Sequence, residues 1–415
     1  MPARIACMTC AAGAVAVLVS AGAALAQPSV EWTRQVTNPD SDFGEAVACD
    51  NSGRAYLAGS MWTMSPHDAF LAQYHANGTP QWLSTVQAGV GWNEMGHAAA
   101  ADGLGNVWLG GHVEDHFNVY DGFVYQFDVA TGGITHQTRL FLDYSSVNGL
   151  CADGSGSAYL VATANGNGYL AKVTSGAIDW DRSFALGAYG EGLAVACDGG
   201  GNVYVAGHQM VNYGGVVRPD VLVEKYAPSG GAPLWSRSFG TEWGEVGTAI
   251  ACDSFGNVYV GGYATGHFAQ PNAGGEDAFI LKLDAADGAE QWGRQFGTAE
   301  DEALWALACD SAGVLYVTGD TAGDLAGPNL GYTDVFHGLV MPDGSIPWME
   351  QWGTSWFDSG TGLCVTGQDM YLSFTAGNSP GGTDDDAFIS KYLIPEPATL
   401  GLLALGGLAL IRRNR

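Results

Sequence analysis

The feature that most constrains the fold is a short phrase that returns seven times along the chain, at intervals of about fifty residues. Its clearest copy is Ala251-Cys252-Asp253, followed by Tyr259. The aromatic residues of the seven copies are Tyr56, Trp108, Tyr159, Tyr204, Tyr259, Tyr316 and Tyr371. A unit of this length cannot bury its own apolar face, so neighbouring copies must stack to form a core. The chain is therefore predicted to be a repeat protein.

The composition between the two ends is typical of an all-β protein. The chain has 62 glycines, and its short apolar runs are interrupted by Gly, Asn and Asp. In the clearest repeat, strands are expected over residues 248–252, 258–262, 277–283 and 291–296. Four antiparallel strands make one propeller blade. The sequence therefore predicts a β-propeller with seven four-stranded blades.

The outermost strand of most repeats carries a second phrase, Trp-x-Arg. Residues i and i+2 share one face of a strand, so the Arg is expected to lie over the indole at a contact between blades. The first such strand, residues 31–36, precedes every innermost strand, while the last repeat stops after its third strand, residues 387–392. The N-terminal strand is therefore predicted to complete the seventh blade and close the ring, which removes the unpaired edges.

Both ends of the chain look like targeting signals. Residues 1–26 have the layout of a secretory signal helix, with a basic start, an apolar stretch and small residues Ala24 and Ala26 before a cleavage point at Gln27. Residues 394–415 form an apolar tail that is short for a membrane span and ends in arginines. The propeller is thus expected over residues 27–393. The named residues of the tail are Pro395, Glu396, Pro397, Arg412, Arg413 and Arg415.

This tail, with its Pro-Glu-Pro triplet, apolar segment and Arg cluster, resembles the PEP-CTERM sorting signal. The resemblance implies processing by an exosortase and a place outside the cell or on the surface of a Gram-negative-type bacterium, with membrane contact only through the tail. The phrases G-N-V-Y-V-x-G and D-A-F-x-x-K resemble the SBBP repeat of bacterial extracellular β-propellers, over residues 30–393. That resemblance implies a seven-bladed fold and says little about chemistry.

Six cysteines follow the predicted signal, a number that in a secreted chain ordinarily suggests three disulfides. Five of them occupy one position on successive innermost strands: Cys49, Cys197, Cys252, Cys309 and Cys364. Because these strands belong to different blades, their Cα atoms are expected to lie beyond the roughly 7 Å limit for a bridge. We expect buried thiols that pack as small hydrophobic groups.

Six repeats place a carboxylate in the loop that enters the innermost strand. These residues are Asp42, Glu94, Glu191, Glu245, Glu302 and Asp358. A ring of carboxylates at one mouth of the axial channel would concentrate negative potential and could bind Ca²⁺, the one metal or cofactor that the sequence suggests. The alternative is that each carboxylate caps its own turn or faces water. The turns that follow the innermost strands, such as Asp50 to Gly53, lack the ligand spacing of calcium loops and are expected to be hairpin turns.

The charge excludes one class of partner and the motifs favour no reaction. With 15 basic and 43 acidic residues, the chain has a net charge of −28, which disfavours nucleic acid. No hydrolase, zinc-protease or phosphate-loop motif is present. We therefore expect a monomeric, non-enzymatic scaffold that binds a polysaccharide or protein partner through loop residues such as Tyr213, Asn272 and Tyr332. The alternative is a quinoprotein-like propeller enzyme working at the channel mouth, although that class has eight blades.

Overall fold

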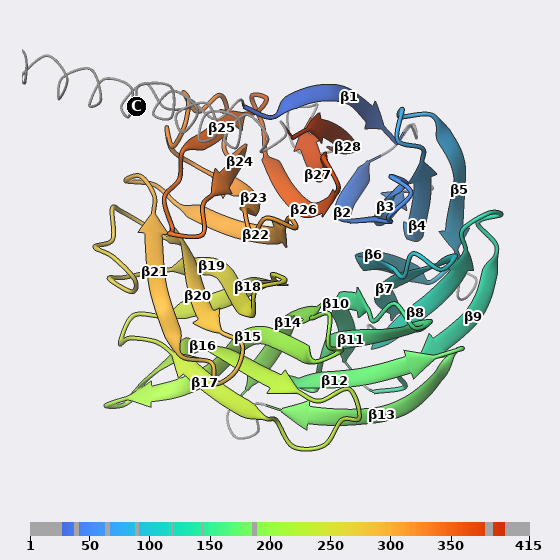
Figure 1. Cartoon of the computed structure of the whole chain (residues 1–415), viewed down its shortest axis with the longest axis horizontal. Coiled ribbons are helices and arrows are strands. Elements are labelled where there is room, and N and C mark those ends of the chain that lie inside the picture. The colour runs from blue at the N-terminus through green and yellow to red at the C-terminus, as the bar shows by residue number, and fades with distance from the viewer. Residues whose placement is uncertain are drawn as a thin grey trace, which may run out of the picture. The chain divides into compact units, whose positions relative to one another are not determined.

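In the computed structural model, the described residues form 28 strands in seven four-stranded antiparallel sheets. These residues are 27–36, 41–62, 67–87, 91–115, 117, 119–142, 144–184, 189–377 and 385–394. Residues 1–26 and 395–415, where the signal and sorting predictions fall, lie outside them. Residues 30–392 form one compact unit, and Figure 1 shows its sheets arranged as blades around an axis. Among the described residues, no helix is long and apolar enough to cross a membrane.

Each blade begins with its innermost strand and proceeds outward. Blade one contains β2 (Asp42–Cys49), β3 (Ala55–Trp62), β4 (His67–Tyr74) and β5 (Pro80–Val86). Blade two contains β6 (Asn93–Ala101), β7 (Asn106–Glu114), β8 (Tyr120–Asp128) and β9 (Ile134–Arg139). Blade three contains β10 (Ser145–Ala152), β11 (Ser157–Ala164), β12 (Asn167–Thr174) and β13 (Ala177–Phe184).

The remaining blades follow the same order. Blade four contains β14 (Gly190–Cys197), β15 (Val203–Tyr213), β16 (Val216–Tyr226) and β17 (Trp235–Phe239). Blade five contains β18 (Glu245–Cys252), β19 (Asn257–Ala264), β20 (Asp277–Asp284) and β21 (Glu290–Phe296). Blade six contains β22 (Glu302–Cys309), β23 (Leu315–Thr321), β24 (Asp334–Val340) and β25 (Trp348–Trp352). Blade seven contains β26 (Asp358–Thr366), β27 (Asp369–Gly377), β28 (Asp385–Leu393) and β1 (Ser29–Gln35).

The N-terminal strand closes the ring, as predicted. β1 is hydrogen-bonded to β28, which makes it the outermost strand of the seventh blade. The Val36 amide donates to the Ala387 carbonyl at 2.9 Å, and the hydroxyls of Thr33 and Ser390 lie 2.7 Å apart. The seventh blade therefore joins the two ends of the propeller sequence in one sheet.

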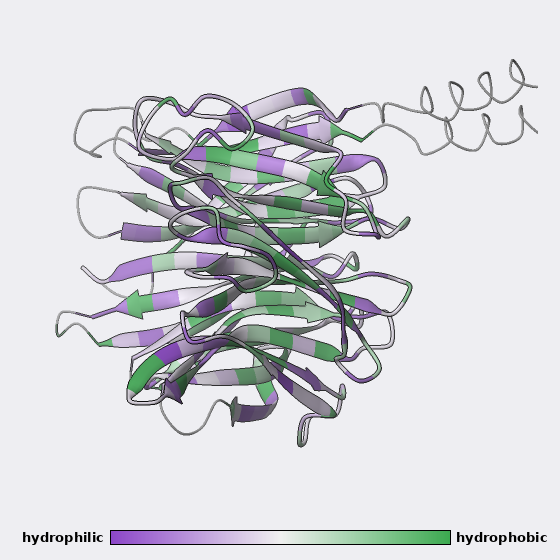
Figure 2. Cartoon of the chain, turned by 90° about the vertical axis from the view of Figure 1, so that its left-hand side faces the viewer, coloured by the Kyte–Doolittle hydropathy of each residue, from purple (hydrophilic) through white to green (hydrophobic). Residues whose placement is uncertain are grey.

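The repeated Asp and Tyr have a structural reason. In blade five the carboxylate of Asp253 accepts hydrogen bonds from the amides of Phe255 and Asn257, which holds the turn between β18 and β19. Its other oxygen accepts from the hydroxyl of Tyr259 at 3.2 Å. The Tyr259 ring is fully buried between sheets, and Figure 2 shows apolar residues along the strands of the unit. These turns are hairpin turns, as expected.

The Trp-x-Arg phrase joins neighbouring blades, as predicted. Trp292 on β21 donates its indole N–H to the Pro342 carbonyl in the outer turn of blade six, at 3.0 Å. Arg294 lies over that indole at 5.7 Å and donates to the Gly344 carbonyl at 2.9 Å. Equivalent indole bonds to the next blade come from Trp32, Trp82, Trp180 and Trp235. Indoles on five of the seven outer strands are thus bonded to the outer turn of the next blade, and an Arg lies over the indole at Trp32 and Trp292.

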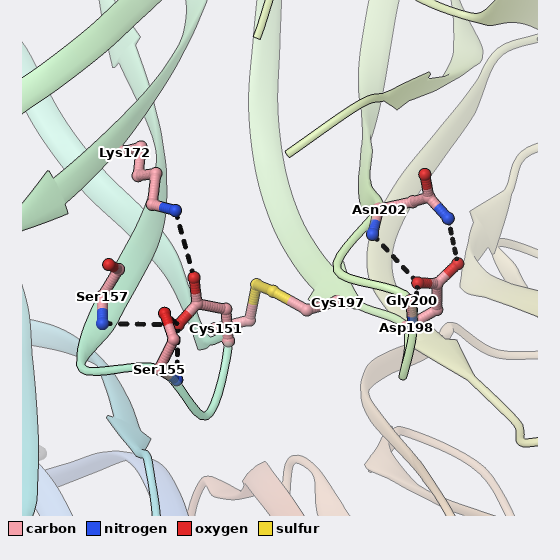
Figure 3. Close-up of a disulfide and its surroundings, with 9 residues drawn as sticks. Cys151, Ser155, Ser157, Lys172, Cys197, Asp198, Gly200 and Asn202 are labelled. Atoms are coloured by element: carbon pink, nitrogen blue, oxygen red, sulfur yellow. Dashed lines mark hydrogen bonds and ion pairs between the residues drawn. A yellow bond between two sulfur atoms is a disulfide. The ribbon is translucent and has the colours of Figure 1, made fainter. Parts of the chain in front are cut away.

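The prediction that no inner-strand cysteines are bridged was wrong. Cys151 of blade three and Cys197 of blade four form a disulfide with a Cα–Cα distance of 6.1 Å, and Figure 3 shows it linking the ends of two inner strands. The two residues do not occupy the same position. Cys151 lies three residues after the bulge in its strand and Cys197 lies four after its own, so their side chains leave opposite sheet faces and meet between the blades.

Candidate functional site

Every inner strand contains a β-bulge at the same place. The register against the second strand skips one residue in each blade, and that residue is left unpaired. The seven bulge residues are Glu45, His97, Asn148, Leu193, Thr248, Trp305 and Thr361. The seven-fold repetition therefore turns one local irregularity into a ring of side chains around the axis.

This ring lines a cavity of about 460 Å³. All seven bulge residues contribute to its wall, together with Ser359, and we call the space the axial cavity. The bulges lie close to the middle of the inner strands, and the one other lining residue among those described, Ser359, is the second residue of β26, so the cavity extends from the middle of the channel toward the end at which the inner strands begin. The wall combines one indole, one carboxyl, one imidazole, one amide and several hydroxyls, which is a lining for a polar ligand with an apolar face.

The pKa values of two titratable side chains in the cavity are shifted so that the uncharged forms are favoured. Desolvation by burial raises the pKa of Glu45 to about 7. Burial, followed by the nearby His112, lowers the pKa of His97 to about 3. The Nε2 atom of His97 lies 3.0 Å from Nδ1 of His112, so these two neutral rings are hydrogen-bonded. Near neutral pH the cavity therefore holds an uncharged imidazole and a carboxyl that is close to half protonated.

Trp305 presents the aromatic surface of the cavity. Its indole N–H donates to the carboxylate of Asp320 at 2.9 Å, and Ser359 donates to the same carboxylate oxygen at 2.8 Å. An edge-on contact with Tyr263, with ring centroids 6.1 Å apart, supports the indole from the neighbouring blade. The Trp305 side chain keeps 37% of its surface exposed, so its ring is fixed in place and accessible.

Exposed aromatic side chains collect on the same face of the propeller. Tyr144, Tyr189 and Phe357 each stand immediately before an inner strand, and Trp243 stands two residues before one. Tyr332, from the connection between β23 and β24, stacks on Phe357 with ring centroids 4.7 Å apart. All five keep more than half of their surface exposed. We call these five residues the aromatic crown.

Two members of the crown have a strained backbone. Tyr144 and Tyr189 adopt φ angles of +54° and +60°, in the left-handed region that bulky side chains rarely occupy. A conformation of this kind costs about 1–3 kcal/mol and persists where the surroundings impose it. The strained residue is exposed at the start of an inner strand in both cases.

The six carboxylates predicted to ring the channel mouth lie elsewhere. Asp42, Glu94, Glu245, Glu302 and Asp358 are completely buried, and Glu191 is half-buried. None of the six lines the axial cavity. The part of the chain that the structure describes contains no group of three or more His, Cys, Asp or Glu side chains that could hold a metal ion. The described structure therefore does not group these residues into a metal site, and calcium binding by them stays a prediction.

For Glu245, Glu302 and Asp358 the physical reason is that the carboxylate accepts hydrogen bonds from the turn before its strand. Glu302 accepts from the amide of Thr298 at 2.6 Å and from the hydroxyl of Thr321 at 2.7 Å. Asp358 accepts from the amides of Thr354 and Gly377. Burial raises the pKa of both carboxyls, although these hydrogen bonds oppose the shift. This is the turn-capping alternative that the sequence left open.

The loop residues proposed as contacts divide into two kinds. The hydroxyl of Tyr213 donates to the carboxylate of Asp220, and Asn272 donates to the Gly275 carbonyl, so both hold their own loops. Tyr332 belongs to the aromatic crown. The bulge residues were missed because their side chains have nothing in common. A usable signal was their setting, since all seven are followed by Ala or Gly and five are preceded by Gly, as in Gly44-Glu45-Ala46.

Comparisons with protein families agree with both resemblances in the sequence. The SBBP β-propeller repeat matches residues 234–269, which run from the outer strand of blade four into the first two strands of blade five. The PEP-CTERM protein-sorting motif matches residues 393–415, which include Pro395, Glu396, Pro397 and the terminal arginines. The chain thus carries a propeller repeat and the sorting motif of exported proteins that exosortase processes.

Known proteins share parts of the sequence or the fold. The regulatory protein FlaEY of Caulobacter vibrioides is 32% identical over 172 residues, which cover 37% of this chain and 18% of that protein. The chain therefore spans less than a fifth of that relative. The Dos1 propeller matches 88% of this chain and 96% of its own at 10% identity, with a TM-score of 0.52. Sqt1 from Chaetomium thermophilum matches 86% and 88% at 10% identity, with a TM-score of 0.48.

Proposed function

We propose that this exported propeller, which carries a PEP-CTERM motif, is a non-enzymatic binding protein for a neutral polysaccharide. One observation carries the proposal: the axial cavity and the aromatic crown lie on the same face. Sugar rings present apolar C–H faces and a rim of hydroxyls, which suit stacking on an indole beside amide, hydroxyl and carboxyl groups. A chain end seated against Trp305 with following units on the crown fits this arrangement.

Charge narrows the class of polysaccharide. The chain carries a net charge of −28, so an anionic polymer would be repelled over the whole surface. Glu45, inside the cavity, would add a further negative charge as the pH rises above about 7. A neutral glycan meets neither penalty, so binding is expected to weaken little with rising ionic strength.

The cavity supports binding better than hydrolysis. Glycosidases ordinarily use two carboxyl groups on either side of the scissile bond. Among the described residues that line the axial cavity, Glu45 is the one carboxyl. The quinoprotein alternative makes a separate prediction, since a bound quinone absorbs visible light. We expect the purified protein to be colourless and to leave the length of the bound glycan unchanged.

Binding is tested by titrating the protein with neutral and anionic oligosaccharides while following tryptophan fluorescence and heat. Neutral glycans are expected to bind, and Trp305→Ala and Tyr189→Ala should each weaken binding by about five- to thirtyfold, because each removes a stacking surface worth roughly 1–2 kcal/mol. Phe255→Ala is the matched control, since Phe255 is an exposed aromatic residue in the turn between β18 and β19, at the other end of the strands. Equal loss in all three variants, or binding of anionic glycans alone, would contradict the proposal.

A further inference from the structure

The ring has one seam, where blade seven meets blade one, and two cysteines lie in it. Cys364 on β26 and Cys49 on β2 pack in the same hydrophobic cluster, which also contains Tyr371 and Val47. Both are half-buried free thiols in this structure. Blades three and four show what such a pair can become, since Cys151 and Cys197 are bridged there. We propose that Cys49 and Cys364 form a second disulfide, which locks the closed ring across its seam.

The two pairs occupy equivalent positions in the fold. Cys151 and Cys364 each stand three residues after the bulge of their strand, and Cys197 and Cys49 each stand four after theirs. The expectation that Cys364 shares the position of the other inner-strand cysteines was therefore wrong. Successive residues of a strand point to opposite faces, so the first member of each pair faces the following blade and the second faces the preceding blade. The seam therefore repeats the side-chain directions of the bridged pair.

The backbone at the seam also repeats the close approach seen at the bridge. In blades three and seven the residue directly after the bulge is glycine, whereas the other five blades have alanine there. A Cβ added to Gly149 would lie 3.2 Å from the amide nitrogen of Val195, and one added to Gly362 would lie 2.7 Å from that of Val47. Only glycine lets neighbouring inner strands come this close, just before the cysteine on the same face.

Contact between the two thiols is already present. Burial, and then a hydrogen bond with the Cys49 side chain, raise the pKa of Cys364 well above its usual value. The folded thiol is therefore mostly protonated and a poor nucleophile. Oxidation is expected while the seam is still open, before burial suppresses the thiolate.

The chemistry balances as a thiol–disulfide exchange. One cysteine thiolate attacks a disulfide oxidant in the export compartment and displaces one of its sulfurs as a thiol. The second cysteine then attacks this mixed disulfide, forms the Cys49–Cys364 bond and releases the other sulfur as a thiol. Two electrons and two protons pass from the cysteine pair to the oxidant, which becomes a dithiol.

The other two free cysteines among the described residues form a control within the same chain. Cys252 packs in a cluster with Ala196 of the preceding blade, and Cys309 packs in another with Ala251. Both stand four residues after their bulges, and the facing position holds alanine in each case. These thiols lie in separate contacts between blades and are expected to stay reduced.

The test is disulfide mapping of full-length protein folded in the presence of glutathione disulfide. The unreduced, denatured protein is alkylated, digested and analysed by mass spectrometry. We expect peptides linked through Cys49 and Cys364, alongside the Cys151–Cys197 link, with Cys252 and Cys309 alkylated. Alkylation of Cys49 and Cys364 in protein that contains the Cys151–Cys197 link would overturn the proposal.

The melting temperature with and without reductant gives a second test. It compares the same variant in two redox conditions, so it does not require that a variant unfolds. In a Cys151→Ser, Cys197→Ser background, a reductant present throughout folding should lower the Tm by several degrees, because the seam disulfide closes a loop of six blades. Adding Cys49→Ser should abolish that response, whereas adding Cys252→Ser should preserve it. A Tm that is insensitive to reductant in the background protein would also overturn the proposal.

Discussion

At the scale of single residues, Glu45 links the chemistry of the cavity to stability. Its pKa is raised from 4.5 to about 7 by desolvation, so the folded state binds the proton more tightly than the unfolded state. The contribution of Glu45 to stability is therefore full below about pH 4.5 and is lost as the pH rises toward 7. Above that pH the carboxylate in the channel is charged, and its desolvation lowers the stability of the folded state.

Replacing Glu45 with Gln removes this dependence. The variant should match the parent within error at pH 4.5 and be more stable at pH 8, by about 1–3 kcal/mol, because the side chain is only half-buried and water screens part of the cost. Chemical unfolding of both proteins at the two pH values measures the difference directly. A variant that is less stable than the parent at pH 8 would show that the ionised carboxylate is favourably paired.

A second residue-scale test concerns the packing of tryptophan on a turn glycine. Gly288 has a φ of +73°, and a Cβ there would lie 2.8 Å from the Trp235 ring of the preceding blade. Gly256 has a φ of +84° with nothing within 4 Å of its Cβ position. Gly256→Ala should cost about 1 kcal/mol through the backbone alone, and Gly288→Ala should cost about 1–3 kcal/mol more because the indole must move. Equal losses in urea unfolding would mean that the indole contact contributes nothing.

At the scale of elements, the repeat predicts strands well and side-chain directions less well. The expected strands of blade five match β18 to β21 closely, although β18 begins three residues earlier, at Glu245. The strand positions can be predicted because the repeated phrases mark the turns between strands. The repeat spacing does not reveal a bulge, because the inserted residue can be of any kind. The cavity ring depends on that inserted residue, which explains why it was missed. The true position of Cys364 was hidden for another reason: Tyr371 follows the bulge of its strand by ten residues, whereas Tyr56 and Tyr204 follow theirs by eleven.

The N-terminal strand offers the element-scale prediction. Deleting residues 27–36 removes β1, leaves β28 with an unpaired edge and takes away the partner of the Lys391–Glu31 ion pair at 2.8 Å. We expect a large fall in Tm and aggregation through the exposed edge, measured by calorimetry and light scattering. Adding a peptide of residues 27–36 in trans should restore part of the lost stability. A truncated protein that melts like its parent would contradict the closure of the seventh blade.

At the scale of the whole molecule, the architecture separates stability from recognition. The Asp–Tyr turns and the Trp-x-Arg contacts repeat from blade to blade and hold the ring together. The bulge residues and the residues of the aromatic crown differ from blade to blade but occupy similar positions in the fold. Their side chains can therefore suit a ligand without any change in the scaffold. The location of this variable set on one face follows from the structure, while the sorting motif at residues 393–415 assigns the chain to export.

The measurement that tests the central claim most directly is a crystal structure of the propeller with the neutral oligosaccharide that binds most tightly. We predict sugar density in the axial cavity, with one ring stacked on Trp305 and further units reaching the aromatic crown. Glu45 and Asn148 should lie within hydrogen-bond distance of the sugar hydroxyls. A glycan bound at the opposite face, near Phe255, or an empty cavity at saturating ligand would contradict the account.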